Sequence, residues 1–306
     1  MKHRARSASA VFALLSMGAS QGLAQTTDFF VLLSEGNAGG QVLQLDSSGN
    51  IVGPFATGLD SPRGTAIAPN GDFFVSVQGF GSVERFTPAG LQSTLLNADT
   101  LNSAGIGGPL APFDLEVNAE GDLFVSNNAT DQILRVDGVT GEVSVFAEVQ
   151  GTRGLGFAPD GTLFVSQAAG AISQVDTDGN VSLFAAGSSG IIEPFDVQVD
   201  SQGNVFAVNQ LDPIGFTDGQ ILRFTPEGDV SIFSDADVRG LAIGPDDSVF
   251  GSTAAGTIVQ ITPGGIESVF ASGLGNPFAF DLVFVPTPGS VAVLAAGGLV
   301  ATRRRR

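Results

Sequence analysis

Apolar and polar residues alternate in short runs along most of the chain, and glycine-marked turns separate these runs. In residues 195–199, 204–208, 220–224 and 229–233, the apolar positions largely follow the two-residue period of β-strands. The connecting residues, such as 200–203, carry the Asp, Asn, Ser and Gly that favour tight turns. This segment therefore predicts four consecutive antiparallel strands.

The same unit recurs along the chain, and its second strand carries a Phe at a constant place. These residues are Phe30, Phe74, Phe124, Phe164, Phe206 and Phe250, with steps of 44, 50, 40, 42 and 44 residues. A repeat of this length is typical of closed arrays of small sheets. The pattern predicts an all-β fold, a six-bladed β-propeller of four-stranded antiparallel blades. An all-β sandwich is the alternative, and the matched registers argue against it.

The two ends of the repeat array complement each other. The first copy lacks an opening strand, whereas the last copy, residues 280–285, contains only an opening strand. We therefore expect the ring to close by pairing the N-terminal strands (residues 28–57) with the C-terminal strand (residues 279–285).

The opening strands begin alternately with Arg-Gly and with Phe-Asp. Together with two asparagines at second-strand ends, their polar side chains form a candidate ligand ring at the channel mouth. The ring consists of Arg63, Asp114, Asn127, Arg153, Asp196, Asn209, Arg239 and Asp281. One interpretation is a site for a small oxygen-rich ligand or a cation. The other is a set of neighbouring Arg-Asp pairs that neutralise each other and tie blade to blade, and the strict alternation favours it.

The longest insertions all fall on the face that carries this mouth. They are Ser34–Gly40, Asn97–Pro112, Ala186–Pro194 and Gln210–Gly219, whereas the turns of the opposite face are short. Variable loops on a rigid scaffold usually carry binding. We therefore expect a small molecule, a glycan or a protein to bind to the loop-rich face.

Residues 194–206, with the pattern Pro-x-x-Val-x-Val-Asp-x-x-Gly-Asn-Val-Phe, resemble the NHL repeat and the related gluconolactonase-like propellers. The resemblance covers residues 28–286 and implies a scaffold that hosts hydrolases, lyases and binding modules alike. The gluconolactonase-like metal-ligand position matches Arg63, Phe113, Arg153, Phe195, Arg239 and Phe280 here, and these side chains cannot coordinate calcium. No cofactor is therefore expected to be required, although Asp114, Asp196, Asn127 and Asn209 are candidate Ca²⁺ ligands.

Composition excludes several chemistries. The chain contains no Cys, and its single histidine is His3, so thiolate sites are excluded and a Ser-His-Asp triad is lost once a leader is removed. Virginiamycin-lyase-type propellers resemble the same repeats but rely on histidine. We therefore favour a binding or structural module over an enzyme. The alternative is an oxygen-liganded, metal-dependent hydrolase or lyase, lactonase-like, acting on a lactone or a sugar derivative.

Charge narrows the class of partner. The whole chain has a formal net charge of −18 at pH 7. The body, residues 25–286, contains six arginines and 31 acidic residues and therefore has a net charge of −25. Such a surface repels nucleic acid and anionic lipid, so neither is expected as a partner of the body.

Residues 1–24 have the form of a secretory signal peptide. Basic residues precede an apolar run, and small residues lead to a cleavage site after Ala24. The sequence thus divides into a signal peptide (1–24), a propeller (25–286) and a tail (287–306).

The tail has three parts in a fixed order. A proline-rich motif, Pro286-Thr287-Pro288-Gly289, precedes an apolar stretch and a basic cluster, Arg303-Arg304-Arg305-Arg306. This order resembles the PEP-CTERM sorting signal of bacterial envelope proteins, with Thr287 at the place of the usual Glu. The resemblance implies processing by an exosortase-type protease, transient membrane contact through the tail, and delivery to the bacterial cell surface, outer envelope or extracellular matrix.

Overall fold

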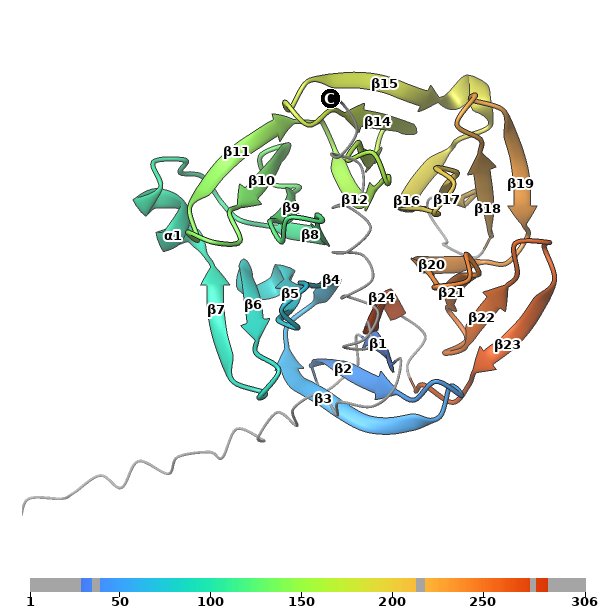
Figure 1. Ribbon diagram of the computed structural model, residues 1–306, viewed down its shortest axis with the longest axis horizontal. Helices are drawn as coiled ribbons and strands as arrows, with labels where there is room; N and C mark the ends of the chain where they lie inside the picture. Colours follow the sequence, from blue (N-terminus) through green and yellow to red (C-terminus); the bar gives the residue numbers. More distant parts are fainter. Residues whose placement is uncertain (1–28, 35–38, 213–217, 276–278, 286–306) are drawn as a thin grey trace, which may run out of the picture.

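The strands form six four-stranded antiparallel sheets arranged around a common axis (Figure 1). The computed structural model describes residues 29–34, 39–212, 218–275 and 279–285. The all-β propeller of four-stranded antiparallel blades expected from the repeat is confirmed. The proposed signal peptide and sorting tail lie outside the described residues.

Five blades each consist of four consecutive strands, ordered from the axis to the rim. The first two are β4 (Pro62–Ile67), β5 (Phe73–Val77), β6 (Ser82–Phe86) and β7 (Gln92–Leu96), then β8 (Pro112–Val117), β9 (Leu123–Asn127), β10 (Gln132–Val136) and β11 (Val143–Glu148). The next two are β12 (Thr152–Phe157), β13 (Leu163–Gln167), β14 (Ala171–Val175) and β15 (Val181–Ala186), then β16 (Glu193–Val199), β17 (Val205–Gln210), β18 (Gly219–Phe224) and β19 (Val230–Ser234). The fifth is β20 (Val238–Ile243), β21 (Val249–Thr253), β22 (Ile258–Ile261) and β23 (Glu267–Ala271).

The sixth sheet joins the two ends of the array. Its order is β24-β1-β2-β3, with β24 (Ala279–Val285) innermost and β1 (Phe29–Ser34), β2 (Gly40–Leu45) and β3 (Ile51–Leu59) following outward. Phe30 of β1 lies opposite Phe284 of β24 in an antiparallel ladder. The ring therefore closes through strands from both ends of the sequence, as the complementary copies predict.

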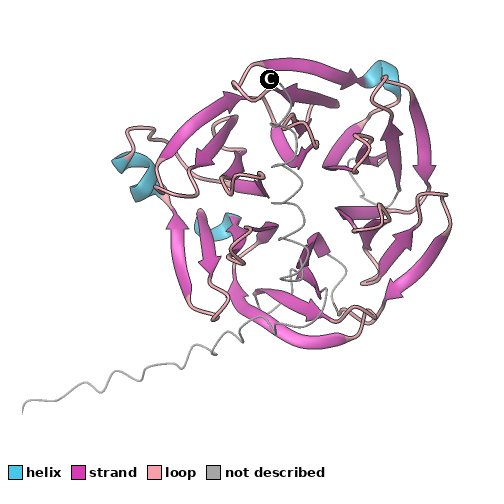
Figure 2. Cartoon of the chain, viewed as in Figure 1, coloured by secondary structure: helices cyan, strands magenta, loops and turns pink. Residues whose placement is uncertain are grey.

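Helical structure among the described residues is confined to short segments (Figure 2). They are η1 (Gln78–Phe80), α1 (Ala98–Ser103) and η2 (Gly187–Ser189). Asn97 and Thr100 cap α1 reciprocally, which stabilises a helix of less than two turns. No helix among the described residues is long and apolar enough to cross a membrane.

The repeated Phe explains how each blade packs on its neighbour. Within a blade, the second-strand ring meets an outer-strand ring edge-on, as in Phe164 and Phe184, whose ring centroids lie 4.8 Å apart. Phe124 also contacts Phe157 of the next blade at 5.0 Å, so one ring serves two sheets. Edge-to-face aromatic pairs at this spacing add to the burial of their apolar area. The core is thus a series of clusters between adjacent blades, as in the cluster around Phe124 and Leu155.

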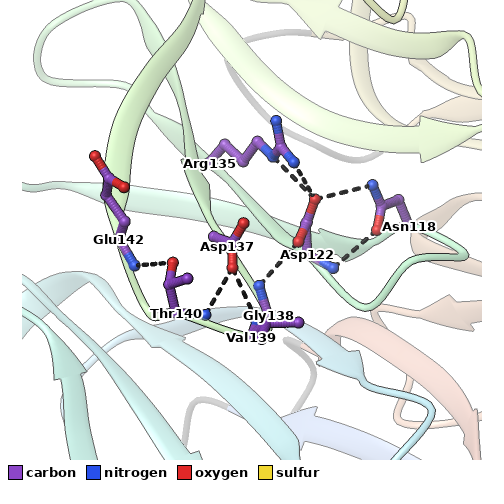
Figure 3. Close-up of polar contacts among 8 residues, drawn as sticks. All are labelled: Asn118, Asp122, Arg135, Asp137, Gly138, Val139, Thr140 and Glu142. Carbon is purple, nitrogen blue, oxygen red and sulfur yellow. Dashed lines mark hydrogen bonds and ion pairs between the residues drawn. The ribbon is translucent and has the colours of Figure 1, made fainter.

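On the face of the short turns, arginines pair with turn aspartates. Arg135 Nη2 lies 2.6 Å from Asp122 Oδ2, and the Gly138 amide donates to Asp122 Oδ1 at 2.8 Å (Figure 3). Arg85 and Asp72 form the equivalent pair in the preceding blade, at 2.5 Å. These two arginines hold the third strand to the turn before the second strand, so they have a structural role on this face.

Candidate functional site

Three of the aspartates predicted for the ring converge on the axis. Asp114, Asp196 and Asp281, each 6 to 7% exposed, line one narrow cavity together with Arg63, Phe113, Gly154 and Phe195. The cavity has a volume of about 10 Å³, which is close to the space that a single water needs. The three carboxylates therefore lie in a confined space.

Each of these carboxylates joins its own blade to the next one. Oδ1 accepts a hydrogen bond from the following residue's amide at 2.7 to 2.8 Å, and Oδ2 accepts one from an amide of the neighbouring innermost strand. The contacts between blades are Asp114 with Leu155 at 2.7 Å, Asp196 with Leu241 at 2.6 Å, and Asp281 with Thr65 at 2.6 Å. Thr65 Oγ1 also donates to Asp281 at 2.7 Å. We refer to these three contacts as the aspartate latches.

Two of the blades that open with Arg-Gly, those of β4 and β12, are joined to their successors by serines. The hydroxyl of Ser76 accepts from the Gly64 amide at 2.8 Å and donates to the Phe113 carbonyl of the next blade at 3.0 Å. Ser166 makes the same two contacts, at 2.9 and 3.1 Å. From the blade of β4 to the blade of β20, serine and aspartate latches therefore alternate. A blade that opens with Phe-Asp is thus joined to the next blade by its aspartate, whereas these two blades that open with Arg-Gly are each joined by a serine.

The latches also explain the glycine that follows each arginine. A Cβ added to Gly64 would lie 2.6 Å from Asp114 Cα and 2.5 Å from its Oδ1, and one added to Gly154 would lie 2.7 Å from Asp196 Cα. Such distances are shorter than any ordinary contact, and the neighbour in each case is partly backbone. Only glycine lets the two innermost strands approach closely enough for the serine latch.

We expect Gly64→Ala to lower the free energy of unfolding by about 3 kcal/mol, because overpacking must push the β4 and β8 strands apart. Gly187→Ala is the matched control, since a Cβ there meets nothing within 4 Å. Urea unfolding of both variants measures the difference. Equal stability of the two variants would show that the β4 to β8 approach is not tight.

The arginines do not neutralise the ring aspartates, so the favoured Arg-Asp interpretation is wrong. Arg153 Nη2 pairs with Glu193 Oε1 at 2.7 Å, and the guanidinium lies 5.1 Å from the Phe195 ring centroid. Arg63 donates from Nε to Gln78 Oε1 at 3.2 Å and lies over the Phe113 ring. The reason is register: each Arg aligns with a Phe, each Gly aligns with an Asp, and adjacent residues of a strand point to opposite sides.

Arg239 lies at the corresponding position of the β20 strand and is 2% exposed. Its Nη1 is 4.0 Å from Asp237 Oδ1, the distance of a loose ion pair. Burial lowers the pKa of Arg239 and Asp237 opposes this shift, although the guanidinium stays charged throughout the physiological range.

The two asparagines of the predicted ring hold loops in place. Asn127 accepts from the Ala111 amide at 2.9 Å and donates to the Pro109 carbonyl at 3.0 Å. Asn209 accepts from the Ile192 amide at 2.8 Å and donates to the Gly190 carbonyl at 3.0 Å. Both side chains are fully buried. They therefore position two insertions of the loop-rich face, residues 97–112 and 186–194, without reaching the channel.

Burial and mutual repulsion govern the charge of the aspartates. Burial raises the pKa of Asp114 to about 7, against the opposing effect of its amide donors. The pKa values of Asp196 and Asp281 are raised well above the usual range, first by burial and then by the Asp114 charge. Burial and Asp114 likewise raise the pKa of Glu116 to about 8. Part of this cluster therefore keeps its protons at neutral pH.

Within the described ranges, no group of three carboxylate or imidazole side chains is spaced to hold a metal ion. The latch geometry accounts for this, because both oxygens of each ring aspartate already accept backbone amides. The arrangement supports rigid closure of the ring.

Sequence reasoning missed Glu193 and the latch serines. Glu193 lies in an insertion, and nothing in its surroundings links it to Arg153, 40 residues earlier. The serines left a visible signal, because each follows the second-strand Phe at the same distance. Ser76 and Ser166 form the latches; Ser126 and Ser252 occupy the same place in their blades, and all four are fully buried.

No protein-family model matches the chain, and no curated protein matches it. Solved structures share its fold. A chain of a nidogen/laminin complex has a TM-score of 0.69 at 11% identity, covering 85% of this chain and 99% of the other. A catalytically inactive virginiamycin B lyase from Staphylococcus aureus with quinupristin has a TM-score of 0.59 at 14% sequence identity. The match covers 86% of this chain and 94% of the lyase chain. Regucalcin, a calcium-binding protein from Agrobacterium tumefaciens, has a TM-score of 0.56 at 14% sequence identity. The match covers 72% of this chain and 76% of the regucalcin chain. At these identities the likeness concerns the fold alone.

Proposed function

We propose that this protein is an exported binding or structural module of the bacterial cell surface, envelope or matrix, acting through its loop-rich face. The observation that carries the proposal is that the channel residues are used for closure. The three ring aspartates join blades, and the two asparagines hold loops. Such a channel supports a rigid scaffold better than it supports a metal-dependent lactonase.

The ion pair at the mouth is the part of this face best suited to a ligand. Arg153 Nη1 and Glu193 Oε2 are buried and have no hydrogen-bond partner among the residues that the structure describes, although the two residues bind each other through their other atoms. Buried donors and acceptors normally have partners. A hydroxyl or an amide of a ligand satisfies both atoms at once, so we assign a neutral ligand, a glycan or a peptide segment, to this position.

Three further features support a role in binding outside the cell. The leader and the tail have the form of export and sorting signals, and an exosortase-type protease is the processing partner that we propose. A fold of this kind occurs in the nidogen/laminin complex, an assembly of two proteins. The charge of −25 on the body favours neutral or cationic partners over nucleic acid.

An array of glycans and matrix proteins, probed with the full chain, tests the proposal. We expect binding to a small set of neutral ligands, weakened at least tenfold by Arg153→Met, which removes the guanidinium and keeps the length of the side chain. Asp160→Asn, on the opposite face, is the control and should leave binding unchanged. Binding that both variants reduce equally, or that neither reduces, would contradict a site at this mouth.

A further inference from the structure

A groove opens on the face of the short turns, between the blade of β12 and the blade of β16. Its volume is about 360 Å³, which falls in the range of small-ligand sites. Phe164 and Phe184 line it with aromatic rings, Thr162 and Gln174 with a hydroxyl and an amide, and Asp160 with a carboxylate. We call it the turn-face groove. It lies on the face opposite the loops and shares no lining residue with the channel cavity.

The position of Gln174 is occupied by an arginine in other blades. In three blades the third-strand residue opposite the repeated Phe is an arginine: Arg85, Arg135 and Arg223. In the blade of β12 it is Gln174, opposite Phe164. Residues directly opposite each other in antiparallel strands have their side chains on the same side of the sheet. The groove therefore lies where these three blades hold a guanidinium of their own.

The turn residue beside this position also differs. Two residues before the repeated Phe, the blades of β4 and β8 have Asp72 and Asp122, and each binds the arginine of its blade. In the blade of β12 the residue at this place is Thr162. In the blade of β16 it is Asn204, and Arg223 is nevertheless present there. This position therefore accommodates a guanidinium without a turn carboxylate.

The size of one residue in the next blade explains why the groove is open here. The blade of β20 also has a glutamine, Gln260, opposite its repeated Phe. There, Phe284 of the next blade packs on Phe250, with ring centroids 5.1 Å apart. The residue at the same place beside the blade of β12, three after the latch aspartate, is Val199, which packs against the Phe164 cluster but is smaller than Phe. The blade of β12 thus lacks both the arginine and the neighbouring ring.

Charge favours a cation as the occupant of the groove. Asp160 is exposed at its edge, and none of the described residues that line it is basic. The body as a whole carries −25, which raises the local concentration of cations. A guanidinium also binds against aromatic rings. The chain shows this contact elsewhere, since Arg153 lies 5.1 Å from the Phe195 ring centroid.

We propose that the turn-face groove binds an arginine side chain of a partner protein. Its guanidinium takes the place that Arg85 and Arg135 fill in their own blades. The groove is larger than one guanidinium, so the aliphatic stem of the arginine and the adjoining peptide enter with it. This site is separate from the ligand position proposed at the mouth, because the two lie on opposite faces.

Isothermal titration calorimetry of the full chain with short peptides tests this proposal. The probe is acetyl-Ala-Arg-Ala-amide, and the matched control is the same peptide with citrulline, which has nearly the same shape and no charge. We expect the arginine peptide to bind at least about tenfold more tightly than the citrulline peptide, and high salt to weaken its binding. Methylguanidinium is the third probe and should bind more weakly than the peptide. Equal affinity would overturn the assignment to a protein partner and leave the groove to free guanidino compounds.

A double variant separates the groove from the rest of the acidic surface. Thr162→Asp, Gln174→Arg recreates the Asp122–Arg135 pair of the blade of β8 and fills the groove with the chain's own guanidinium. It should weaken peptide binding at least about tenfold. The two changes cancel in net charge, so a general attraction to the acidic body would survive them. Gln260→Arg, the same change in the blade of β20, is the control and should leave binding unchanged.

Thermal unfolding of each variant checks that the blades remain folded. The double variant should be as stable as the wild type, because the same pair is already accommodated in another blade. Failure of the arginine peptide to bind at millimolar concentration overturns the proposal. Binding that persists in the folded double variant also overturns it, because the peptide then binds elsewhere on the chain.

Discussion

Replacing Asp281 by alanine is expected to lower the free energy of unfolding by about 4 kcal/mol, because two buried donors of Thr65 lose their acceptor, each at a cost of about 1 to 3 kcal/mol. Asp281 Oδ2 accepts both the amide and the hydroxyl of Thr65, at 2.6 and 2.7 Å. The residue lies on β24, which completes the composite sheet and packs beside β4. Its loss therefore weakens the one latch that joins the end of the array to its beginning.

A graded series of variants measures the effect in urea. Asp281→Asn keeps one acceptor oxygen, so we expect about half of the loss. Asp160→Ala removes an exposed turn carboxylate that accepts only the Thr162 amide, at 2.9 Å, and should cost less than about 1 kcal/mol. If Asp281→Ala proved as mild as Asp160→Ala, the aspartate latch would contribute nothing to ring closure.

Stability is expected to fall as pH rises from about 5.5 to 8, the reverse of ordinary acid denaturation. The folded pKa of Asp114 is raised to about 7 from 3.8, so the folded state binds more protons than the unfolded state between these values. The stabilisation that Asp114 contributes is fully present below its pKa in the unfolded state and is lost as the pH rises through its pKa in the folded state. One pKa unit corresponds to about 1.4 kcal/mol, so Asp114 alone accounts for about 4 kcal/mol over the whole interval between its two pKa values and for about 2 kcal/mol of it above pH 5.5.

Asp196, Asp281 and Glu116 shift in the same direction and extend the effect above pH 7. The exposed turn aspartates Asp46 and Asp176 have lowered pKa values, because they accept hydrogen bonds from Asn50 and Asn180. Their contribution to the free energy of unfolding has the opposite pH dependence: it is lost as pH falls below about 4. This loss lies outside the pH range from 5.5 to 8.

Urea midpoints across this pH range measure the slope for the wild type and for Asp114→Asn. The variant removes one titrating group and lessens the repulsion felt by the other two aspartates. We therefore expect a flatter profile, whatever its absolute stability. A wild-type profile that rises or stays level between pH 5.5 and 8 would mean that the carboxylates are ionised at little cost.

The fold was predictable because four of the repeats obey the same packing rule, with a second-strand Phe against an outer-strand Phe. The second-strand Phe has the same neighbours in successive blades, as Phe124 and Phe164 show, so its spacing reports the architecture directly. Ring closure followed from the missing opening strand, since an unpaired edge at one end must meet its complement at the other. Local turn chemistry and alternation were sufficient for both conclusions.

The site was less predictable, because spacing places residues at one level of a ring without showing which way they point. Arg63 and Asp114 occur at the same level of successive blades, but they differ in register by one residue. That shift separates a guanidinium stacked on Phe113 from a carboxylate bonded to Leu155. Glu193, which contacts Arg153, lies where an insertion joins the β16 strand, and insertions do not follow the repeat from which the other positions were predicted.

Closure by β24 also constrains how the chain reaches its native state. The contact between Thr65 and Asp281 spans 216 residues of sequence, so it is one of the last that synthesis makes possible. Long-range pairing of this kind raises contact order and slows folding, because loop-closure entropy must be overcome before the contact stabilises the ring. Until β24 has been made, β1 lacks its inner neighbour and β4 lacks a neighbour in the adjacent blade. The ring therefore cannot close until its final strand is available.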